Sequence, residues 1–397
     1  MTTDKREVYL DYAATTPVKD EVLQEMLPYF TRKFGNPSSL YSVGQESKNA
    51  VNQARERVAS LIGAQPREVI FTSSGTEADN WALIEIARAR QDKGRHVITT
   101  KIEHHAILHS GEALEKEGFE VTWLDPDSEG FIPPEALRAA IRPDTTLVSV
   151  MMANNEIGTL EPIRELAAIA KESDAVFHTD AVQALGNIPI DVKDLGIDLM
   201  SISAHKIYGP KGIGALYIRR GVKLPNHMFG GAQELGKRAG TENLTGIVGF
   251  GKAAELAQAN LEEHAGNLTE LRNYFISSVE SRIEDVKLNG SRTYRLPGNV
   301  NFTFKYIEGE ALLLLLDMAG VAVSTGSACS SASLTPSHVL AAIGVPVEMI
   351  HGSVRFTLGD FTTKQDLDYV VDVLEESVLK LRKISSISRD TVWKQNV

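Results

Sequence analysis

The sequence has a single cysteine, Cys329, among its 397 residues. An intrachain disulfide and a cysteine-rich metal site are therefore both excluded. Long apolar runs are also lacking: the most apolar stretch, residues 311–316, is far too short to cross a bilayer and predicts one buried helical segment. The first residues show neither the apolar core nor the small-residue cleavage site of a signal peptide. Together these absences predict a cytoplasmic protein without membrane association.

The sequence has fewer basic than acidic residues. There are 41 Lys and Arg residues against 52 Asp and Glu residues, which gives a net charge of −11, and no dense basic run occurs. Because nucleic-acid grooves need clustered Lys and Arg to meet the phosphate backbone, we expect no direct nucleic-acid partner. The chain is longer than the size at which a single hydrophobic core usually stops growing, which predicts two lobes.

The first two-thirds of the chain alternates short β-rich runs with amphipathic stretches, as βαβ units around a mostly parallel sheet do. Seven strands are expected, at residues 68–72, 96–100, 121–124, 146–151, 175–178, 199–203 and 215–218. Helices are expected at residues 47–62, 76–89, 134–141 and 162–171. The pattern predicts an α/β fold whose large domain holds a mostly parallel seven-stranded sheet.

The pattern changes near residue 261. A long charged stretch, residues 261–283, predicts a helical connector into a second lobe. This lobe shows strand patterns at residues 299–304 and 354–358 and helical patterns at residues 310–319 and 365–384. We therefore expect a large domain formed by residues 15–260, and a smaller α+β domain formed by residues 1–14 and 261–397.

Five of the predicted strands are followed by chemically active side chains. They lie in the segments 73–77, 103–105, 153–156, 180–183 and 205–206. Ligands of open α/β sheets bind beyond the carboxyl ends of the strands, so these hydroxyl, imidazole, amide, carboxylate and amine groups should meet at one rim. Each segment alone is typical of a polar turn, but five at one edge favour a binding site.

The first of these segments has the features of a phosphate cradle. Ser73-Ser74-Gly75 is a turn of small residues that leads into a predicted helix. A helix N-terminus offers free N–H groups and the positive end of its dipole to an anion, Gly75 allows close backbone approach, and Thr76 adds a hydroxyl. A Ser or Thr helix cap looks the same, so this turn indicates phosphate only in combination with the other segments.

Two further patterns point to other ligands. Residues 231–237 have the spacing of a nucleotide-binding P-loop, but Arg238 stands where Ser or Thr would hold magnesium, and no buried strand precedes them. His105 and His109 lie four residues apart near Glu103, a spacing that zinc could use. Since the metalloprotease Glu between the histidines and an obvious third ligand are lacking, we predict no metal site.

Several motifs resemble those of a known enzyme family. Ser203-Ala-His205-Lys206 and His178-Thr-Asp180-Ala-Val-Gln183 are similar to segments of fold-type I pyridoxal-phosphate (PLP) enzymes. Ser324-Thr-Gly-Ser-Ala-Cys329-Ser-Ser narrows the resemblance to the cysteine desulfurases of the nitrogen-fixation and iron–sulfur-assembly type, within the class V aminotransferase family. The motifs run in the expected order from Tyr9-Leu-Asp-Tyr to Arg355-Phe-Thr-Leu358 and cover nearly the whole chain. The PLP-dependent transferase fold of type I is therefore expected.

The resemblance assigns most of the predicted rim to the cofactor. It implies that Lys206 carries PLP as a Schiff base and that Asp180 pairs with the protonated pyridine nitrogen, which keeps the ring an effective electron sink. It also implies that Gln183 contacts the phenolic oxygen and that His104 stacks on the ring. Asn155 is expected to position the ring oxygen and the substrate.

The resemblance further implies a homodimer with composite active sites. Thr241, in Arg238-Ala-Gly-Thr-Glu-Asn243, matches a threonine that reaches the phosphate from the second subunit. Arg355 matches the arginine that holds the substrate carboxylate, because its planar fork fits two oxygens. The other phosphate donors that the resemblance implies are Gly75, Thr76, Ser203 and His205.

Cys329 carries the distinctive step that the resemblance implies. Lys206 moves the proton at the α-carbon of bound L-cysteine, and the thiolate of Cys329 attacks the substrate sulfur, leaving a persulfide and alanine. His104 is a further candidate for proton transfer near the sulfur. Residues 324–336 around Cys329 are almost all small, so we expect a mobile loop.

Several alternatives stay open. A selenocysteine lyase or another class V aminotransferase would use the same cofactor, although the aminotransferase needs no thiol such as Cys329. A non-catalytic scaffold of the same fold would not need Lys206, Asp180, Arg355 and Cys329 together. The partner that accepts the sulfur is either an iron–sulfur scaffold protein or an acceptor of another pathway, such as tRNA thiolation.

Overall fold

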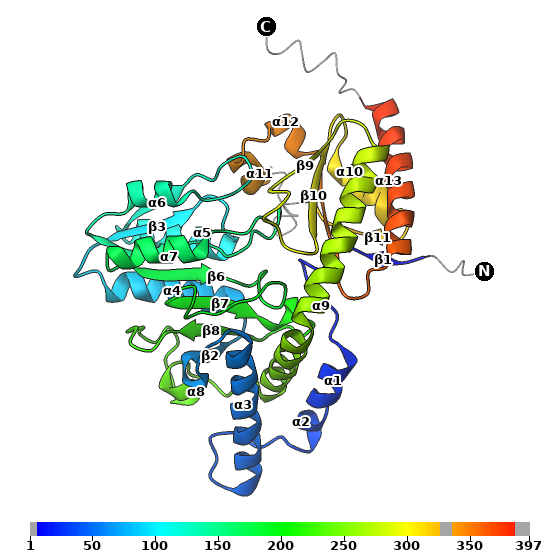
Figure 1. The fold of residues 1–397 in the computed structure, drawn as a ribbon. Helices are drawn as coiled ribbons and strands as arrows, with labels where there is room; N and C mark the ends of the chain where they lie inside the picture. Colours follow the sequence, from blue (N-terminus) through cyan, green and yellow to red (C-terminus); the bar gives the residue numbers. More distant parts are fainter. Residues whose placement is uncertain (1–5, 326–335, 386–397) are drawn as a thin grey trace.

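The computed structural model describes residues 6–325 and 336–385, and a sheet of seven strands lies at its centre (Figure 1). The strands are β2 (Val69–Thr72), β3 (His96–Thr100), β4 (Glu120–Leu124), β5 (Thr145–Ser149), β6 (Val176–Asp180), β7 (Leu199–Ser203) and β8 (Gly214–Ile218). Their order is β2-β8-β7-β6-β5-β3-β4, in which β8 runs antiparallel to both neighbours and the other pairs are parallel. The seven predicted strands and the mostly parallel sheet are confirmed.

Helices cover both faces of this sheet. The helices as far as residue 282 are α1 (Asp20–Met26), α2 (Pro28–Thr31), α3 (Ser42–Leu61), α4 (Gly75–Ala89), α5 (His105–Lys116), α6 (Pro134–Ala140), α7 (Ile163–Glu172), α8 (Gln233–Gly236) and α9 (Leu244–Arg282). Successive strand residues alternate between two cores: Ile70 belongs to the core that includes residues of α4 and α5, whereas Phe71 belongs to the core that includes residues of α3, α7 and α9. This period of two gives three layers with the sheet in the middle.

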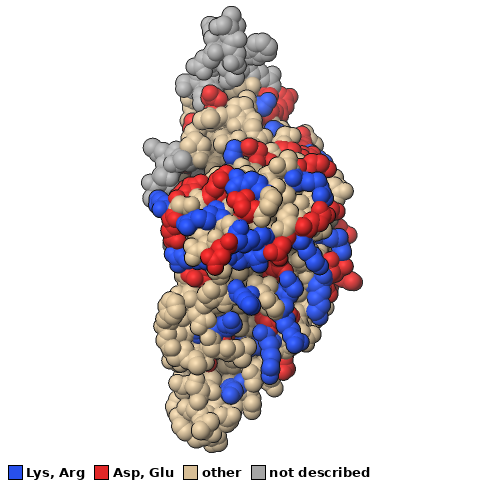
Figure 2. All heavy atoms as spheres, turned by 90° about the vertical axis from the view of Figure 1, so that its left-hand side faces the viewer, with Lys and Arg blue, Asp and Glu red and all other residues tan. Residues whose placement is uncertain are grey.

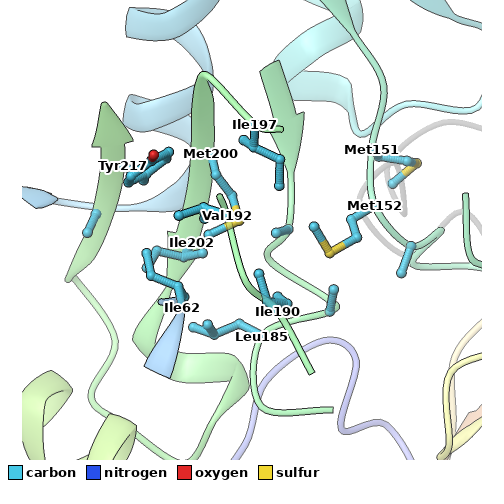
Figure 3. Close-up of a cluster of buried hydrophobic side chains, with 14 of the residues drawn as sticks. Ile62, Met151, Met152, Leu185, Ile190, Val192, Ile197, Met200, Ile202 and Tyr217 are labelled. Carbon is cyan, nitrogen blue, oxygen red and sulfur yellow. The ribbon is translucent and has the colours of Figure 1, made fainter. Parts of the chain in front are cut away.

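The larger core anchors the strands whose ends form the rim. Figure 3 shows Met200 and Ile202 of β7 with Ile62, Ile190 and Val192, all of them buried. Each fully buried side chain of this size contributes about 1.5–3 kcal/mol of transfer free energy. Rigid strands in such a core hold the polar residues that follow them in fixed positions.

A second, smaller unit combines a three-stranded antiparallel sheet, in the order β12-β10-β9, with the parallel pair β1-β11. Its strands are β1 (Val8–Tyr9), β9 (Val286–Leu288), β10 (Asn299–Phe304), β11 (Val321–Ala322) and β12 (Ser353–Thr357). The helices that follow α9 are α10 (Gly309–Met318), α11 (His338–Ala342), α12 (Val347–Ile350) and α13 (Lys364–Ile384). Phe275, Phe302 and Phe356 lie in a core of its own.

This separate core supports the division into residues 15–260 and residues 1–14 with 261–397, which we retain as a proposal. Val8 and Leu10 belong to the second core, as the division requires. Leu296 and several residues of α11 and α12 instead join the first core, so the later segment also contacts the large domain.

Helix α9 begins much earlier than predicted. The charged pattern indicated a helix at residues 261–283, but α9 starts at Leu244 and continues for 39 residues to Arg282. The side chain of Asn243 caps it by accepting a hydrogen bond from the N–H of Gly246. Glycines weaken the helical pattern in this first half. The packing requires one of them, because a Cβ at Gly251 would lie 2.5 Å from the Cα of Ala54 in α3.

The apolar stretch at residues 311–316 lies in α10, but its predicted burial is only partly correct. Leu312 and Leu316 are buried, whereas Leu314 is 62% exposed. The helical period explains the difference, since residue 314 points away from the face that residues 312 and 316 share. Within residues 6–325 and 336–385, no helix is long and apolar enough to cross a membrane.

Buried Glu103 ties two strand ends together. Its Oε1 accepts hydrogen bonds from the hydroxyl of Thr100 and the N–H of Met151, both at 2.9 Å. Burial raises the pKa of Glu103 to about 8. Glu156, which follows β5, accepts a hydrogen bond of 2.5 Å from Ser337, and burial raises its pKa to about 7. The native state therefore keeps protons that the unfolded chain would release.

We predict that the contribution of Glu103 and Glu156 to the free energy of unfolding falls as the pH rises from about 5 to about 8. Glu103 and Glu156 stay protonated in the native state over most of this range but ionise in the unfolded state near pH 4.3, so the unfolded state binds fewer protons. Glu103→Gln should flatten the slope by up to about 1.4 kcal/mol per pH unit in denaturant unfolding. The exposed Glu112→Gln on α5 is the control, and an unchanged slope in Glu103→Gln would contradict the prediction.

Candidate functional site

A cavity of about 480 Å³ opens where β2, β3, β5, β6 and β7 end. Its lining contains these residues that the sequence predicted for a site: Gly75, Thr76, His104, Asn155, Asp180, Gln183, Ser203, His205, Lys206 and Arg355. Most follow strands of the central sheet, while Arg355 comes from β12 of the smaller sheet. The structure thus brings these residues together between the two sheets.

Of the predicted site residues that the structure describes, Thr241 is not among those lining this cavity. Thr241 is exposed in the segment between α8 and α9. Cys329, with most of the loop predicted at residues 324–336, lies outside the described residues.

Lys206 lies at the end of the short 3₁₀ helix that follows β7. Its Nζ donates hydrogen bonds to the carbonyl oxygens of Ala13, at 2.5 Å, and Ala14, at 2.8 Å. Gln183 donates to the same carbonyl of Ala13 at 3.0 Å, so the N-terminal segment is held against the lysine. Tyr208, two residues further on, has a φ of 63°, a left-handed conformation that costs about 1 kcal/mol or more.

Four buried carboxyl groups line the cavity: Asp79, Glu103, Glu156 and Asp180. Asp180, at the end of β6, accepts a hydrogen bond of 2.8 Å from the N–H of Val182, and burial raises its pKa to about 6. Asp79 on α4 is 1% exposed; burial and then the charge of Asp180 raise its pKa well above the usual range. Sequence reasoning missed Asp79. Its signal was the position four residues after Gly75, about one turn along the same helix.

Two imidazoles of the lining are neutral at physiological pH. Burial, with the charges of His105 and Lys206, lowers the pKa of His104 to about 4. Burial and Lys206 likewise lower the pKa of His205 to about 4. Nδ1 of His104 accepts a hydrogen bond from the N–H of Ala106 at 3.2 Å, so a neutral ring carries its proton on Nε2. His104 therefore presents a flat, uncharged ring.

Arg355 is buried, with 4% of its surface exposed, and is held in place from two sides. Nη1 donates to the carbonyl oxygen of Asn155 and Nη2 to the carboxylate of Asp11, both at 2.8 Å. A guanidinium has five N–H groups, so further donors remain for an anion. Asp11 was also missed from sequence, because only the tertiary structure brings it beside a residue 344 positions away.

The two competing sequence patterns have other roles. Residues 231–237 surround the short helix α8, where buried Glu234 accepts hydrogen bonds of 2.8 Å from both terminal nitrogens of Arg55. The rings of His105 and His109 lie 5.4 Å apart, and His338 lies 5.0 Å from His105. In the part of the chain that the structure describes, no group of three His, Cys, Asp or Glu residues could hold a metal ion.

The lining suits PLP, which needs an amine, a carboxylate for its ring nitrogen, a flat ring partner and phosphate donors. Lys206, Asp180, His104 and the turn before α4 are of these kinds, and all line the one cavity. Among the described residues, Oδ1 of Asp79 and Nε of Arg355 are buried without a hydrogen-bond partner. Such orphaned atoms are rare in proteins and fit a cavity that takes a polar ligand.

Comparisons with known proteins agree with this arrangement. The family model "Aminotransferase class-V" matches residues 8–370. The chain is 59% identical over 392 residues to cysteine desulfurase IscS of Dictyoglomus turgidum, with 99% of each chain covered. It is 58% identical over 387 residues to cysteine desulfurase IscS of Clostridium botulinum strain Hall, covering 97% of this chain and 98% of that one.

A solved structure of a NifS-like protein matches the fold with a TM-score of 0.90 at 38% identity, covering 95% of this chain and 100% of the other. The predicted PLP-dependent fold of type I and the resemblance to cysteine desulfurases are confirmed by these matches. This chain belongs to the class-V aminotransferase family of PLP-dependent enzymes.

Proposed function

We propose that this protein is a cysteine desulfurase, which removes sulfur from L-cysteine, releases L-alanine and holds the sulfur as a persulfide on Cys329. The observation that carries the proposal is that Lys206, Asp180, His104 and Arg355 line one cavity, in a chain 59% identical to a protein named for this activity. The sulfur then passes to an acceptor protein, for iron–sulfur cluster assembly or another thiolation pathway.

The cofactor has a defined place in this proposal. When bound, PLP supplies an electron sink for the negative charge that develops at the substrate α-carbon. Lys206 would hold it covalently and Asp180 would pair with its ring nitrogen, while His104 would lie on its face. The remaining contacts would come from Gln183 and Asn155 to the ring oxygen and, to the phosphate, from Gly75, Thr76, Ser203 and His205.

The substrate carboxylate would bind to Arg355. Its guanidinium is already fixed by Asp11 and the carbonyl of Asn155, so little side-chain freedom is lost when the substrate binds. The planar fork also fits two carboxylate oxygens better than an ammonium group would. The α-carbon of L-cysteine would then be oriented toward Lys206.

Two groups of the cavity act on the substrate. Lys206 moves the proton at the α-carbon of the substrate, and the Nε2–H of neutral His104 can donate a hydrogen bond near the substrate sulfur. The Cys329 thiolate then attacks the substrate sulfur: an S–S bond forms, the C–S bond breaks, and the β-carbon takes up a proton to give alanine. A cytoplasmic location is part of this proposal, because a reducing compartment keeps a lone thiol free.

We also propose a homodimer with composite active sites. Large apolar side chains are exposed on and around α1, α2 and the start of α3: Leu23, Leu27, Phe30, Phe34, Leu40, Tyr41 and Val43. Figure 2 shows few charged side chains at the lower end of the molecule, where the start of α3 lies. Such a patch supports a protein interface, and exposed Thr241 is accessible to a second copy.

PLP binding is the first test. The purified protein should be yellow with PLP, and borohydride should fix the cofactor on Lys206, because reduction traps the covalent link. Peptide mass analysis locates the modified residue. Lys206→Ala should lose the link and exposed Lys193→Ala should keep it. If the protein takes up no PLP, the assignment of PLP as its cofactor is disproved.

The persulfide is the second test. After exposure to L-cysteine, mass analysis should find one added sulfur on Cys329. Cys329→Ser should keep the colour of the cofactor but lower sulfide release at least about 10³-fold, since the nucleophile is gone. Normal turnover of cysteine by this variant would disprove the mechanism.

The dimer is tested by sedimentation. Leu40→Asp, at a residue 93% exposed in the monomer, should shift the protein toward monomers because it places a charge in the apolar patch. Leu314→Asp, an exposed position on α10, serves as the matched control. If Leu40→Asp leaves a stable dimer, this patch is not the interface.

A further inference from the structure

An ion pair borders the turn that the proposed function assigns to the cofactor phosphate. Arg238, in the segment between α8 and α9, donates from Nε to one carboxylate oxygen of Glu77 at 2.8 Å and from Nη2 to the other at 3.1 Å. Both side chains are largely buried, with 19% and 13% exposed. The two residues are 161 positions apart, so the fold alone brings them together.

Glu77 shapes this turn from within the first turn of α4. Its Oε2 accepts hydrogen bonds from the N–H of Ser73 at 2.8 Å and from the Ser73 hydroxyl at 2.6 Å. Ser74 in turn caps the helix by accepting a hydrogen bond of 3.1 Å from the N–H of Glu77. Since Ser73, Ser74, Gly75 and Thr76 all line the cavity, Glu77 holds the backbone of the cradle in position.

This arrangement places a negative charge beside the cradle. Burial raises the pKa of Glu77, but hydrogen bonds from Arg238 and Ser73 outweigh that effect and lower the pKa overall, so Glu77 is ionised. A carboxylate close to a phosphate repels it, and the repulsion is weakly screened where side chains are buried. Arg238 cancels this charge at hydrogen-bond distance.

Arg238 is itself held firmly. The segment before it is anchored by the buried pair of Arg55 and Glu234, in which Glu234 has a φ of 43°. Gly240 donates to the side chain of Gln233 at 3.0 Å, which closes the segment on itself. A guanidinium fixed in this way loses little freedom when it pairs with a carboxylate.

We propose that Glu77 and Arg238 are positioning residues for the cofactor phosphate: Glu77 sets the shape of the turn, and Arg238 neutralises the charge that Glu77 brings beside it. The inference rests on the proposed function, since it concerns the site assigned to PLP. If the inference holds, the pair contributes to the preference of the protein for PLP over pyridoxal, which lacks the phosphate.

The test compares PLP with pyridoxal, titrated into the full-length chain after removal of cofactor and followed by absorbance. Arg238→Gln leaves the charge of Glu77 uncancelled, so the Kd for PLP should rise about tenfold or more while that for pyridoxal stays within about twofold. Arg238→Lys should restore much of the affinity for PLP. Arg88→Gln, which breaks the exposed pair with Glu117 near the other end of α4, should change neither Kd.

The direction in which substitution of Glu77 changes the Kd for PLP distinguishes an effect of charge from a purely structural role of the pair. Glu77→Gln removes the negative charge and keeps the cation, so PLP should bind at least as tightly as to the wild type. The double variant Glu77→Gln with Arg238→Gln should bind PLP more tightly than Arg238→Gln alone. If the pair only stabilised the fold, all of these variants would bind PLP and pyridoxal more weakly and to the same extent. That result would overturn the inference.

PLP binding by the wild type distinguishes a failure of this inference from a failure of the proposed function. If the wild type takes up no PLP, the proposed function fails. If the wild type binds PLP and Arg238→Gln binds it equally well, the role of the pair is disproved while the proposed function stands.

Discussion

The site depends on parallel strands held between two hydrophobic cores. Because alternate side chains of each strand pack into cores on opposite faces, as with Ile70 and Phe71, a strand that slipped by one residue would exchange the two sets and disrupt the packing of both cores. The strand ends are therefore fixed, and the polar residues that follow them meet at one edge. Lys206 and Asp180 both owe their positions to this constraint.

Burial then decides the chemistry of these groups. It raises the pKa values of Asp180 and Glu103 and lowers those of His104 and His205, which favours the neutral form of each. A cavity lined by neutral imidazoles suits proton transfer, and a carboxyl group whose ionised form is destabilised gains from pairing with a protonated ring nitrogen. Glu77 is the exception, because hydrogen bonds from Arg238 and Ser73 outweigh its burial and hold it charged.

The smaller sheet completes the site. Arg355 on β12 bonds to the carbonyl of Asn155, which follows β5 of the large sheet, and to Asp11 from the N-terminal segment. Helix α9 spans both units, with Phe250 in the first core and Phe275 in the second. Arg355 is thus positioned by contacts from separate parts of the chain, and its orientation depends on how the units pack.

The sequence by itself determined the seven strands, the mostly parallel sheet, the family and the residues at the strand ends, because period-two burial and short polar motifs are local features. Only the tertiary structure decided which distant side chains pair. Asp11 with Arg355, and Glu77 with Arg238, are far apart in the chain, and no local pattern announces them. The early start of α9 was hidden for a similar reason. Its glycines weaken the helical pattern, and the close packing of Gly251 against α3 exists only in the folded chain.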